Sequence, residues 1–324
     1  MSQEKDAIVT RGLVREFGPV RAVDGIDLSV RQGEIYGFLG PNGAGKTTVI
    51  RMLITLLSPT AGSISVAGFD AVAQPDQVRL RIGAALQEAA LDDKQTGREL
   101  LTLQGRLYGL KEREIASRMG DLTDLIDIGE AMNRKIGTYS GGMKRRLDLA
   151  AALIHQPEIL FLDEPTTGLD PISRNRIFVE VGQINTNLGV TIFLTTQYLE
   201  EADALAHRVG IIDRGRLAAQ GTPLELKHSR GSDLIIINLE APATGEALAA
   251  LEGLPGVDAV DAHDSELTVS SGNGAALVSA VALKLNEMGV GVRELTLRTP
   301  TLDDVFLQVT GSRLQREGAG QEED

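Results

Sequence analysis

The feature that most constrains the fold is the segment Gly40-Pro41-Asn42-Gly43-Ala44-Gly45-Lys46-Thr47-Thr48. It fits the pattern of a phosphate-binding loop, in which glycines let the backbone curl so that its N–H groups face phosphate oxygens. The compact apolar run 34–39 precedes it and reads as a strand. An amphipathic helix is predicted after it, from apolar residues at helical spacing: Val49, Met52, Leu53, Leu56 and Leu57.

Within this loop, we expect Lys46 to pair with the β- and γ-phosphates of ATP and Thr47 to offer its hydroxyl to Mg²⁺. A Gly-rich turn with a surface lysine is the alternative interpretation. The strand before the loop and the helix after it favour the phosphate loop, because that pattern requires this setting. ATP and Mg²⁺ are therefore the predicted substrate and cofactor.

A second functional element is the apolar run 159–162, which ends on Asp163 and Glu164. Adjacent residues of a strand point in opposite directions, so the two carboxylates have different tasks. Asp163 is the candidate partner of Mg²⁺, directly or through water. Glu164 is the candidate base, or orienting group, for the water that attacks the γ-phosphate.

Composition limits the other functions. The chain has no cysteine, which excludes disulfides and thiolate metal sites. Its net charge of −13 opposes a broad contact with phosphate backbones, so nucleic acid is not an expected partner. No apolar run reaches the roughly 18 residues of a spanning helix, and the N-terminus is polar. Any membrane role is therefore expected to depend on a partner.

The order of predicted elements indicates an α/β fold in two domains. Short alternating strands come first, a mainly helical subdomain occupies about 75–155, and the runs 159–162 and 190–194 are strands of a parallel sheet. We end this ATP-binding domain at residue 225. Residues 226–312 read as strand, helix, strand, strand, helix, strand, a ferredoxin-like order, and 313–324 as a mobile tail.

A third motif is Tyr139-Ser140-Gly141-Gly142-Met143-Lys144-Arg145-Arg146, which runs into a predicted helix. It resembles the signature loop of ABC ATPases. The resemblance implies the ABC type of phosphate-loop fold, with a parallel core sheet, an antiparallel edge subdomain and a helical subdomain. It also implies that Ser140, Gly141 and Gly142 bind the γ-phosphate held by a second copy, so that each site is completed by dimerisation with the same chain or a close homologue.

Further residues match the family in order along the chain. Phe17 resembles the aromatic residue that stacks on adenine, and Gln87 the loop glutamine that contacts Mg²⁺ or the attacking water. Asp170, in Gly168-Leu169-Asp170, resembles the loop that crosses the dimer interface. Gln197 stands where most members have a histidine for the γ-phosphate; a glutamine can donate from its amide but carries no titratable charge. Slower or less pH-sensitive hydrolysis is the expected consequence.

The segment Thr299-Pro300-Thr301-Leu302-Asp303-Asp304-Val305-Phe306 narrows the resemblance to daunorubicin-resistance ATP-binding subunits. Thr301 with Asp304 also predicts a capping-box-like helix start. The resemblance implies ATP hydrolysis that powers export of a hydrophobic drug-like compound or lipid. It implies a type-2 membrane permease as partner and a peripheral position on the cytoplasmic face of the membrane. A slow ATPase switch with a ligand-sensing C-terminal domain is the alternative. An ABC ATPase that acts on DNA or ribosomes is a weaker one, because it would need a long coiled-coil insertion or a second cassette, and this sequence shows neither.

Overall fold

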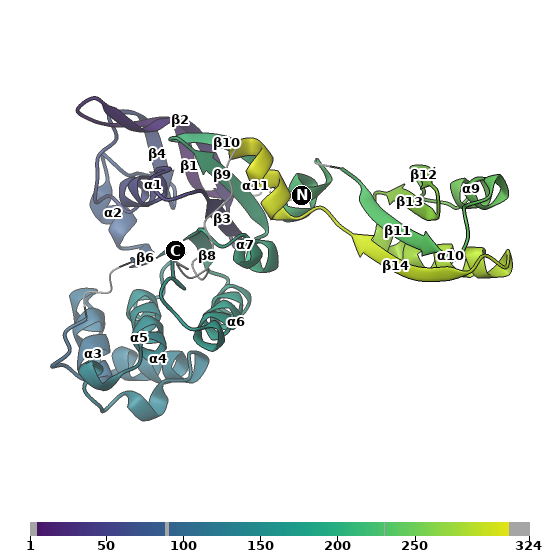
Figure 1. Cartoon of the computed structure of the whole chain (residues 1–324). Coiled ribbons are helices and arrows are strands. Elements are labelled where there is room, and N and C mark those ends of the chain that lie inside the picture. Colours follow the sequence, from purple (N-terminus) through teal and green to yellow (C-terminus); the bar gives the residue numbers. More distant parts are fainter. Residues whose placement is uncertain (1–4, 88–90, 230, 311–324) are drawn as a thin grey trace, which may run out of the picture. The chain divides into compact units, whose positions relative to one another are not determined.

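The chain divides into two compact units, Met1–Pro223 and Leu224–Asp324, drawn in Figure 1. The computed structural model describes residues 5–87, 91–229 and 231–310. Residues 313–324, for which a mobile tail is predicted, lie outside this range. Among the described helices, none has both the length and the apolar character that crossing a membrane requires.

A four-stranded sheet in the order β2-β1-β4-β5 opens the first unit, with antiparallel pairing throughout. The alternation of Ile26, Leu28 and Val30 predicts a half-buried strand, and all three side chains are buried on one face of β2. That strand prediction is confirmed. The strands are β1 (Asp6–Phe17), β2 (Val20–Arg31), β4 (Ala61–Val66) and β5 (Phe69–Asp70).

The second sheet has six strands in the order β10-β9-β3-β8-β7-β6, parallel except for β10. Its central strands are buried along their whole length, as continuous apolar runs predict. Phe161 and Phe193 pack toward α1 and the first sheet, whereas Leu160 and Leu162 pack toward the helices. The strands are β3 (Ile35–Leu39), β6 (Ile82–Ala85), β7 (Ile159–Asp163), β8 (Thr191–Thr196), β9 (Arg208–Asp213) and β10 (Arg216–Gly221).

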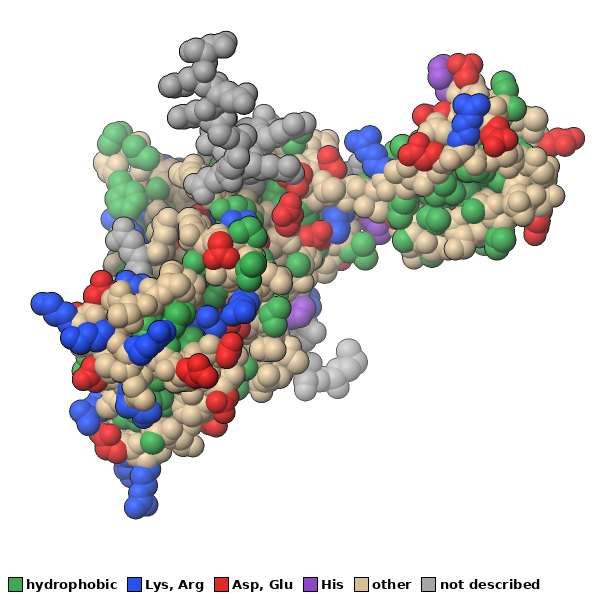
Figure 2. Space-filling model, turned by 60° about the horizontal axis from the view of Figure 1, so that its bottom comes forward, with side chains coloured by type: hydrophobic (Ala, Val, Ile, Leu, Met, Phe, Trp, Pro, Cys, Tyr) green, Lys and Arg blue, Asp and Glu red, His purple; other side chains and the backbone are tan. Residues whose placement is uncertain are grey.

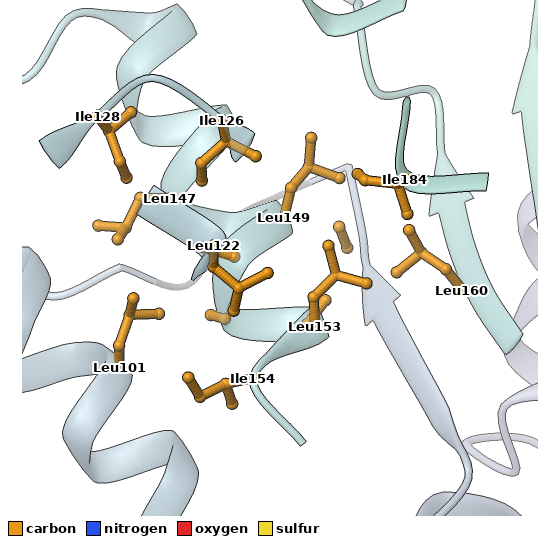
Figure 3. Close-up of a cluster of buried hydrophobic side chains, with 14 of the residues drawn as sticks. Leu101, Leu122, Ile126, Ile128, Leu147, Leu149, Leu153, Ile154, Leu160 and Ile184 are labelled. Carbon is orange, nitrogen blue, oxygen red and sulfur yellow. The ribbon is translucent and has the colours of Figure 1, made fainter. Parts of the chain in front are cut away.

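Helices cover this sheet and build a helical subdomain from α3, α4 and α5 (Figure 1). Figure 3 shows its core, in which Leu101 and Leu122 lie near Leu147 of α5. The helices are α1 (Lys46–Leu53), α2 (Pro75–Arg79), α3 (Gly97–Leu107), α4 (Glu112–Leu125), α5 (Gly141–Leu153), α6 (Pro171–Leu188) and α7 (Leu199–Leu205), with 3₁₀ turns at Gly129–Ala131 and Ile136–Thr138.

Three predicted details of the first unit are wrong. The helical subdomain does not occupy the whole stretch 75–155, because α2 is followed by β6, which pairs with β7 in the core sheet. The helix after the phosphate loop ends at Leu53, since Thr55 adopts a φ of 65°. The helical spacing of Leu100, Leu103, Leu107 and Leu110 predicts one apolar face, but Leu103 and Leu107 are 44% and 71% exposed and do not continue the buried face of Leu100. Figure 2 shows hydrophobic side chains among charges of both signs over the helical subdomain.

The second unit contains an antiparallel sheet in the order β12-β13-β11-β14, the ferredoxin-like order. Alternate residues of β11 point into its core. The predicted helix start near residue 301 is confirmed: Thr301 Oγ1 accepts from Asp304 N, and Asp304 Oδ2 accepts from Thr301 N. The elements are α8 (Pro223–His228), β11 (Asp233–Leu239), α9 (Gly245–Glu252), β12 (Ala259–His263), β13 (Glu266–Ser271), α10 (Gly274–Glu287), β14 (Val292–Arg298) and α11 (Leu302–Thr310).

Candidate active site

The parallel sheet brings the predicted site residues to one edge. In its register, Leu39 of β3 lies opposite Thr196 of β8, and Asp163 of β7 lies opposite Thr195. Ala85 of β6 lies opposite Leu162 in the same way. The carboxyl ends of these four strands therefore coincide, and the segments beginning at residues 40, 86, 164 and 197 all leave the sheet there. Ligands of open α/β sheets bind at this edge.

The phosphate loop leaves β3 at Gly40 and enters α1 at Lys46. Gly45 has a φ of 112°, in the region that side-chain-bearing residues avoid. A Cβ at Gly45 would lie 2.6 Å from the Ala22 carbonyl oxygen, and one at Gly40 would lie 2.5 Å from that of Ile212. Only glycine fits at either position, so the packing around the loop explains two of its glycines.

Lys46 is 4% exposed, yet its ammonium group is well compensated. Its Nζ donates to the carbonyl oxygens of Gly40 at 2.8 Å and Pro41 at 3.3 Å, and lies 3.2 Å from Glu164 Oε1. Burying a charge is costly unless it is paired and hydrogen-bonded, and this one is both. The loop and the end of β7 thus meet at one cation.

Asp163 is buried and is held by two threonines. Thr195 Oγ1 donates to Asp163 Oδ1 at 2.6 Å, and Thr47 Oγ1 lies 3.4 Å from the same oxygen. A hydroxyl and a carboxylate that converge in this way fit Mg²⁺, a cation that prefers oxygen ligands. In the described residues, no group of three or more His, Asp or Glu side chains is arranged to hold a metal. Phosphate and water oxygens would be among the remaining ligands, as in other phosphate-loop sites.

Glu164 follows in a left-handed backbone conformation, with a φ of 47°. Such a conformation is rare for a residue with a side chain and is typical of functional sites. It is held by the Glu164 amide, which donates to Thr195 Oγ1 at 3.0 Å, and by Thr167 Oγ1, which lies 3.3 Å from Glu164 Oε2. Thr195, which the sequence motifs do not single out, therefore positions the carboxylate of Asp163 and the backbone of Glu164.

The other predicted residues differ in their surroundings. Gln87 is exposed just beyond β6, and Gln197 is half-buried just beyond β8. Phe17 ends β1 in the first sheet, where its ring is 46% exposed and the Arg15 guanidinium lies 4.5 Å from its centre. The structure thus brings Lys46, Asp163 and Glu164 together and places both glutamines at the same sheet edge.

Ser140 is the N-cap of α5: its hydroxyl accepts from the Met143 amide at 3.3 Å. A Cβ at Gly142 would lie 2.9 Å from Ser173 Oγ of α6, so the signature loop packs closely on the start of that helix. Asp170 caps α6 by accepting from the Ser173 amide at 3.0 Å, and hydrogen bonds from Ser173 lower the pKa of Asp170. Both loops are therefore helix starts that lie side by side.

Glu201 of α7 is a further buried carboxylate that the motifs do not reveal. It accepts from Thr166 Oγ1 at 2.7 Å and from Thr196 Oγ1 at 2.6 Å. Burial raises the pKa of Glu201, and these hydrogen bonds oppose the shift. The carboxylate links the segment after Glu164 to the segment before Gln197. In the sequence it reads only as part of an acidic helix start.

Comparison with known proteins agrees with this geometry. Residues 23–167 match the family model "ABC transporter", and residues 221–310 match "ATP-binding protein DrrA1-3-like, C-terminal domain". The daunorubicin resistance ATP-binding protein DrrA3 of Streptomyces coeruleorubidus is 47% identical, over 94% of this chain and 96% of that protein. The linearmycin resistance ATP-binding protein LnrL of Bacillus subtilis is 37% identical, over 93% and 97%.

A solved ATP-binding subunit of an ABC transporter superimposes with a TM-score of 0.63 at 26% identity, over 69% of this chain and 92% of that one. For cbiO1 of Clostridium perfringens the TM-score is 0.65 at 26% identity, over 69% and 91%. The fold and site thus define a phosphate-loop ATPase of the ABC type. The chain belongs to the family of ABC transporter ATP-binding proteins, and within it to the daunorubicin-resistance type. It binds and hydrolyses ATP as the ATPase subunit of a transporter.

Proposed function

We propose that this subunit powers export of a hydrophobic drug-like compound or lipid through a type-2 ABC permease, from a peripheral position on the cytoplasmic face of the membrane. The relatives named for resistance to daunorubicin and linearmycin support this class of cargo. The observation that carries the mechanism is the convergence of Lys46, Asp163 and Glu164 at one edge of the sheet. We further propose that residues 1–225 form the ATP-binding domain and 226–312 an accessory domain.

In this mechanism Lys46 holds the β- and γ-phosphates, and backbone N–H groups of the loop 40–48, in which Pro41 has none, surround them. Thr47 and Asp163, with Gln87, would hold Mg²⁺, and a bound Mg²⁺ would neutralise charge on the phosphates. Glu164 accepts a proton from water as the water oxygen bonds to the γ-phosphorus and the bond to the ADP oxygen breaks. Gln197 donates to the γ-phosphate, and Phe17 stacks on adenine through its exposed ring.

Two copies share each site in this proposal. The loop formed by Ser140, Gly141 and Gly142 starts α5, and a helix start is a natural binding site for anions. We expect it to face the γ-phosphate bound by the other copy, with Asp170 of the adjoining loop at the interface. The side-by-side packing of the two loops supports a joint role, because one surface of the chain then presents both.

We expect the permease to dock beside the end of β6. A hollow of about 260 Å³ lies there between the core and the helical subdomain. Leu56, which is 62% exposed, lines it from the core, and Tyr108, the residue after α3, lines it from the helical subdomain. Gln87 follows the same strand end, so a partner in the hollow would sit next to a residue of the ATP site.

The test compares ATPase activity of the purified subunit with and without its permease in lipid vesicles. We expect low activity alone, because only the permease raises the effective concentration of one ATPase copy for the other. Turnover should rise at least about tenfold in the complex and should rise further with a transported compound. Full activity in a strictly monomeric subunit without permease would overturn the shared site and the transport role together.

A further inference from the structure

Arg145 of α5 is buried deeply, although it stands between two other basic residues on the signature helix. It is 8% exposed, whereas the side chain of Lys144 is 34% exposed. An arginine guanidinium carries five N–H donors in a fixed planar arrangement, and burying it is costly unless they are satisfied. The groups that accept hydrogen bonds from Arg145 therefore show which parts of the chain its guanidinium holds in place.

Four of those partners are backbone carbonyl groups at the ends of two strands. Arg145 Nη1 donates to the Leu86 oxygen at 2.6 Å and Nη2 to the Ala85 oxygen at 3.5 Å, both at the end of β6. Nη2 also donates to the Asp163 oxygen at 3.2 Å, and Nε donates to the Pro165 oxygen at 3.0 Å. One guanidinium thus joins the carboxyl ends of β6 and β7.

The guanidinium is itself oriented from α5. Asp148 Oδ2 lies 3.2 Å from Arg145 Nη1, one helical turn further along. Helix α5 packs closely against β6, since a Cβ at Gly83 of β6 would lie 2.2 Å from the carbonyl oxygen of Ala152 of α5. The position of Arg145 is therefore determined by the packing of α5 on β6 as well as by its own hydrogen bonds.

We propose that Arg145 is a positioning residue for ATP hydrolysis: it ties the signature helix to the backbone on either side of Glu164 and immediately before Gln87. The inference rests on the proposed roles of those two residues. Its carbonyl contacts lie at residues 163 and 165 and at 86, so a shift of the guanidinium moves both side chains. Displacements of about 1 Å at such groups cost up to about 100-fold in rate.

The carbonyl groups that Arg145 contacts lie at the ends of β6 and β7 and not in the phosphate loop, which follows β3 and meets β7 through the side chains of Lys46 and Thr47. Arg145→Gln should therefore lower kcat at least about tenfold and leave the Kd for ATP within about threefold. Arg118→Gln is the matched control, since the Arg118 guanidinium donates to the carbonyl oxygen of Ile154, a residue that follows α5 and belongs to neither β6 nor β7. Equal kcat in the two variants, or a Kd that rises as much as kcat falls, would overturn the proposal.

Arg145→Lys gives the second measurement, because it keeps the charge and much of the volume and is the variant expected to fold. A lysine ammonium is a point charge and cannot span two strand ends with a planar fork. We expect a loss of kcat close to that of Arg145→Gln, at unchanged Kd. Wild-type kcat in Arg145→Lys would show that charge alone suffices and would contradict the positioning role.

Glu164→Gln, measured beside these variants, separates the two possible failures. If Glu164→Gln retains turnover, the proposed function of the site is wrong. If Glu164→Gln is inactive and both Arg145 variants turn over like wild type, only the role of Arg145 is wrong. All variants should be measured in the complex with the permease, at about pH 8 and saturating Mg²⁺.

Discussion

Lys46 Nζ lies 3.2 Å from Glu164 Oε1, with both side chains almost fully buried. The pair joins the first turn of α1 to the residue directly after β7, so the group proposed to hold the phosphates and the group proposed to activate water are immediate neighbours. A γ-phosphate bound to Lys46 would stand beside Glu164 without any rearrangement of the sheet. This contact makes the two residues the first targets for mutation.

Lys46→Ala should lower ATP affinity and hydrolysis together. Hydrogen bonds to charged groups are worth about 1.5–3 kcal/mol, or about 10- to 100-fold in Kd. Binding of a fluorescent ATP analogue and steady-state ATPase are the measurements. Lys144→Ala is the control, because Lys144 pairs with Asp93 at the surface. Wild-type hydrolysis by Lys46→Ala would exclude the phosphate-loop role.

The Glu164→Gln variant should bind ATP but should not hydrolyse it. The amide keeps the shape of the carboxylate but cannot accept a proton, and general-base catalysis contributes about 10²- to 10⁴-fold. We expect a dimer that forms with ATP and dissociates only slowly, visible by sedimentation. If this variant stays monomeric with ATP, the division of roles between Asp163 and Glu164 is wrong.

Gln197 can be tested in both directions. Gln197→His should preserve or raise kcat, because it restores the histidine that most family members use to bind the γ-phosphate. It should also make kcat more dependent on pH near neutrality, because histidine titrates there. Gln197→Ala should lower kcat several-fold with little change in ATP affinity. An Ala variant that loses nucleotide binding instead would point to a structural role for Gln197.

The shared site predicts complementation between two inactive variants. In a mixture of Lys46→Ala and Ser140→Ala subunits, each mixed dimer should have one intact site and one site with both defects. About half of the dimers should be mixed at equal concentrations, so part of the lost ATP binding and turnover should return. No recovery at any mixing ratio, with dimers present, would mean that Ser140 acts within its own copy.

Asp148 predicts a pH effect on stability. Burial raises its pKa to about 6 from 3.8, and the Arg145 charge opposes that shift. The folded chain therefore binds more protons than the unfolded chain between these values, so the contribution of Asp148 to the free energy of unfolding falls as the pH rises through this window. Asp148→Asn removes the titration, and its Tm relative to wild type should rise between about pH 4 and pH 6. A constant difference would contradict the raised pKa.

Much of the fold could be predicted because the spacing of apolar residues within a short segment indicates whether that segment forms a strand or a helix. Alternation in β2, continuous apolar runs in β7 and β8, and the order of elements after residue 232 all indicate structures that form from neighbouring residues. Predictions were wrong where contacts with segments far away in the sequence decide which side chains are buried. Leu103 and Leu107 have helical spacing, but which face of α3 is buried depends on α4 and α5.

The sequence alone determined the chemistry of the site, because phosphate binding and water activation need particular side chains and glycines. Gly45 and Lys46 belong to the phosphate-loop motif, and Asp163 and Glu164 end a buried strand, so these residues could be identified from the sequence. Tertiary structure alone decided what surrounds those groups. Arg145 is one of three consecutive basic residues, and nothing in that run shows which of them contacts the ends of β6 and β7. Its burial follows from how α5 packs on β6 and β7, since hydrogen bonds between residues about 60 positions apart exist only once the sheet has formed.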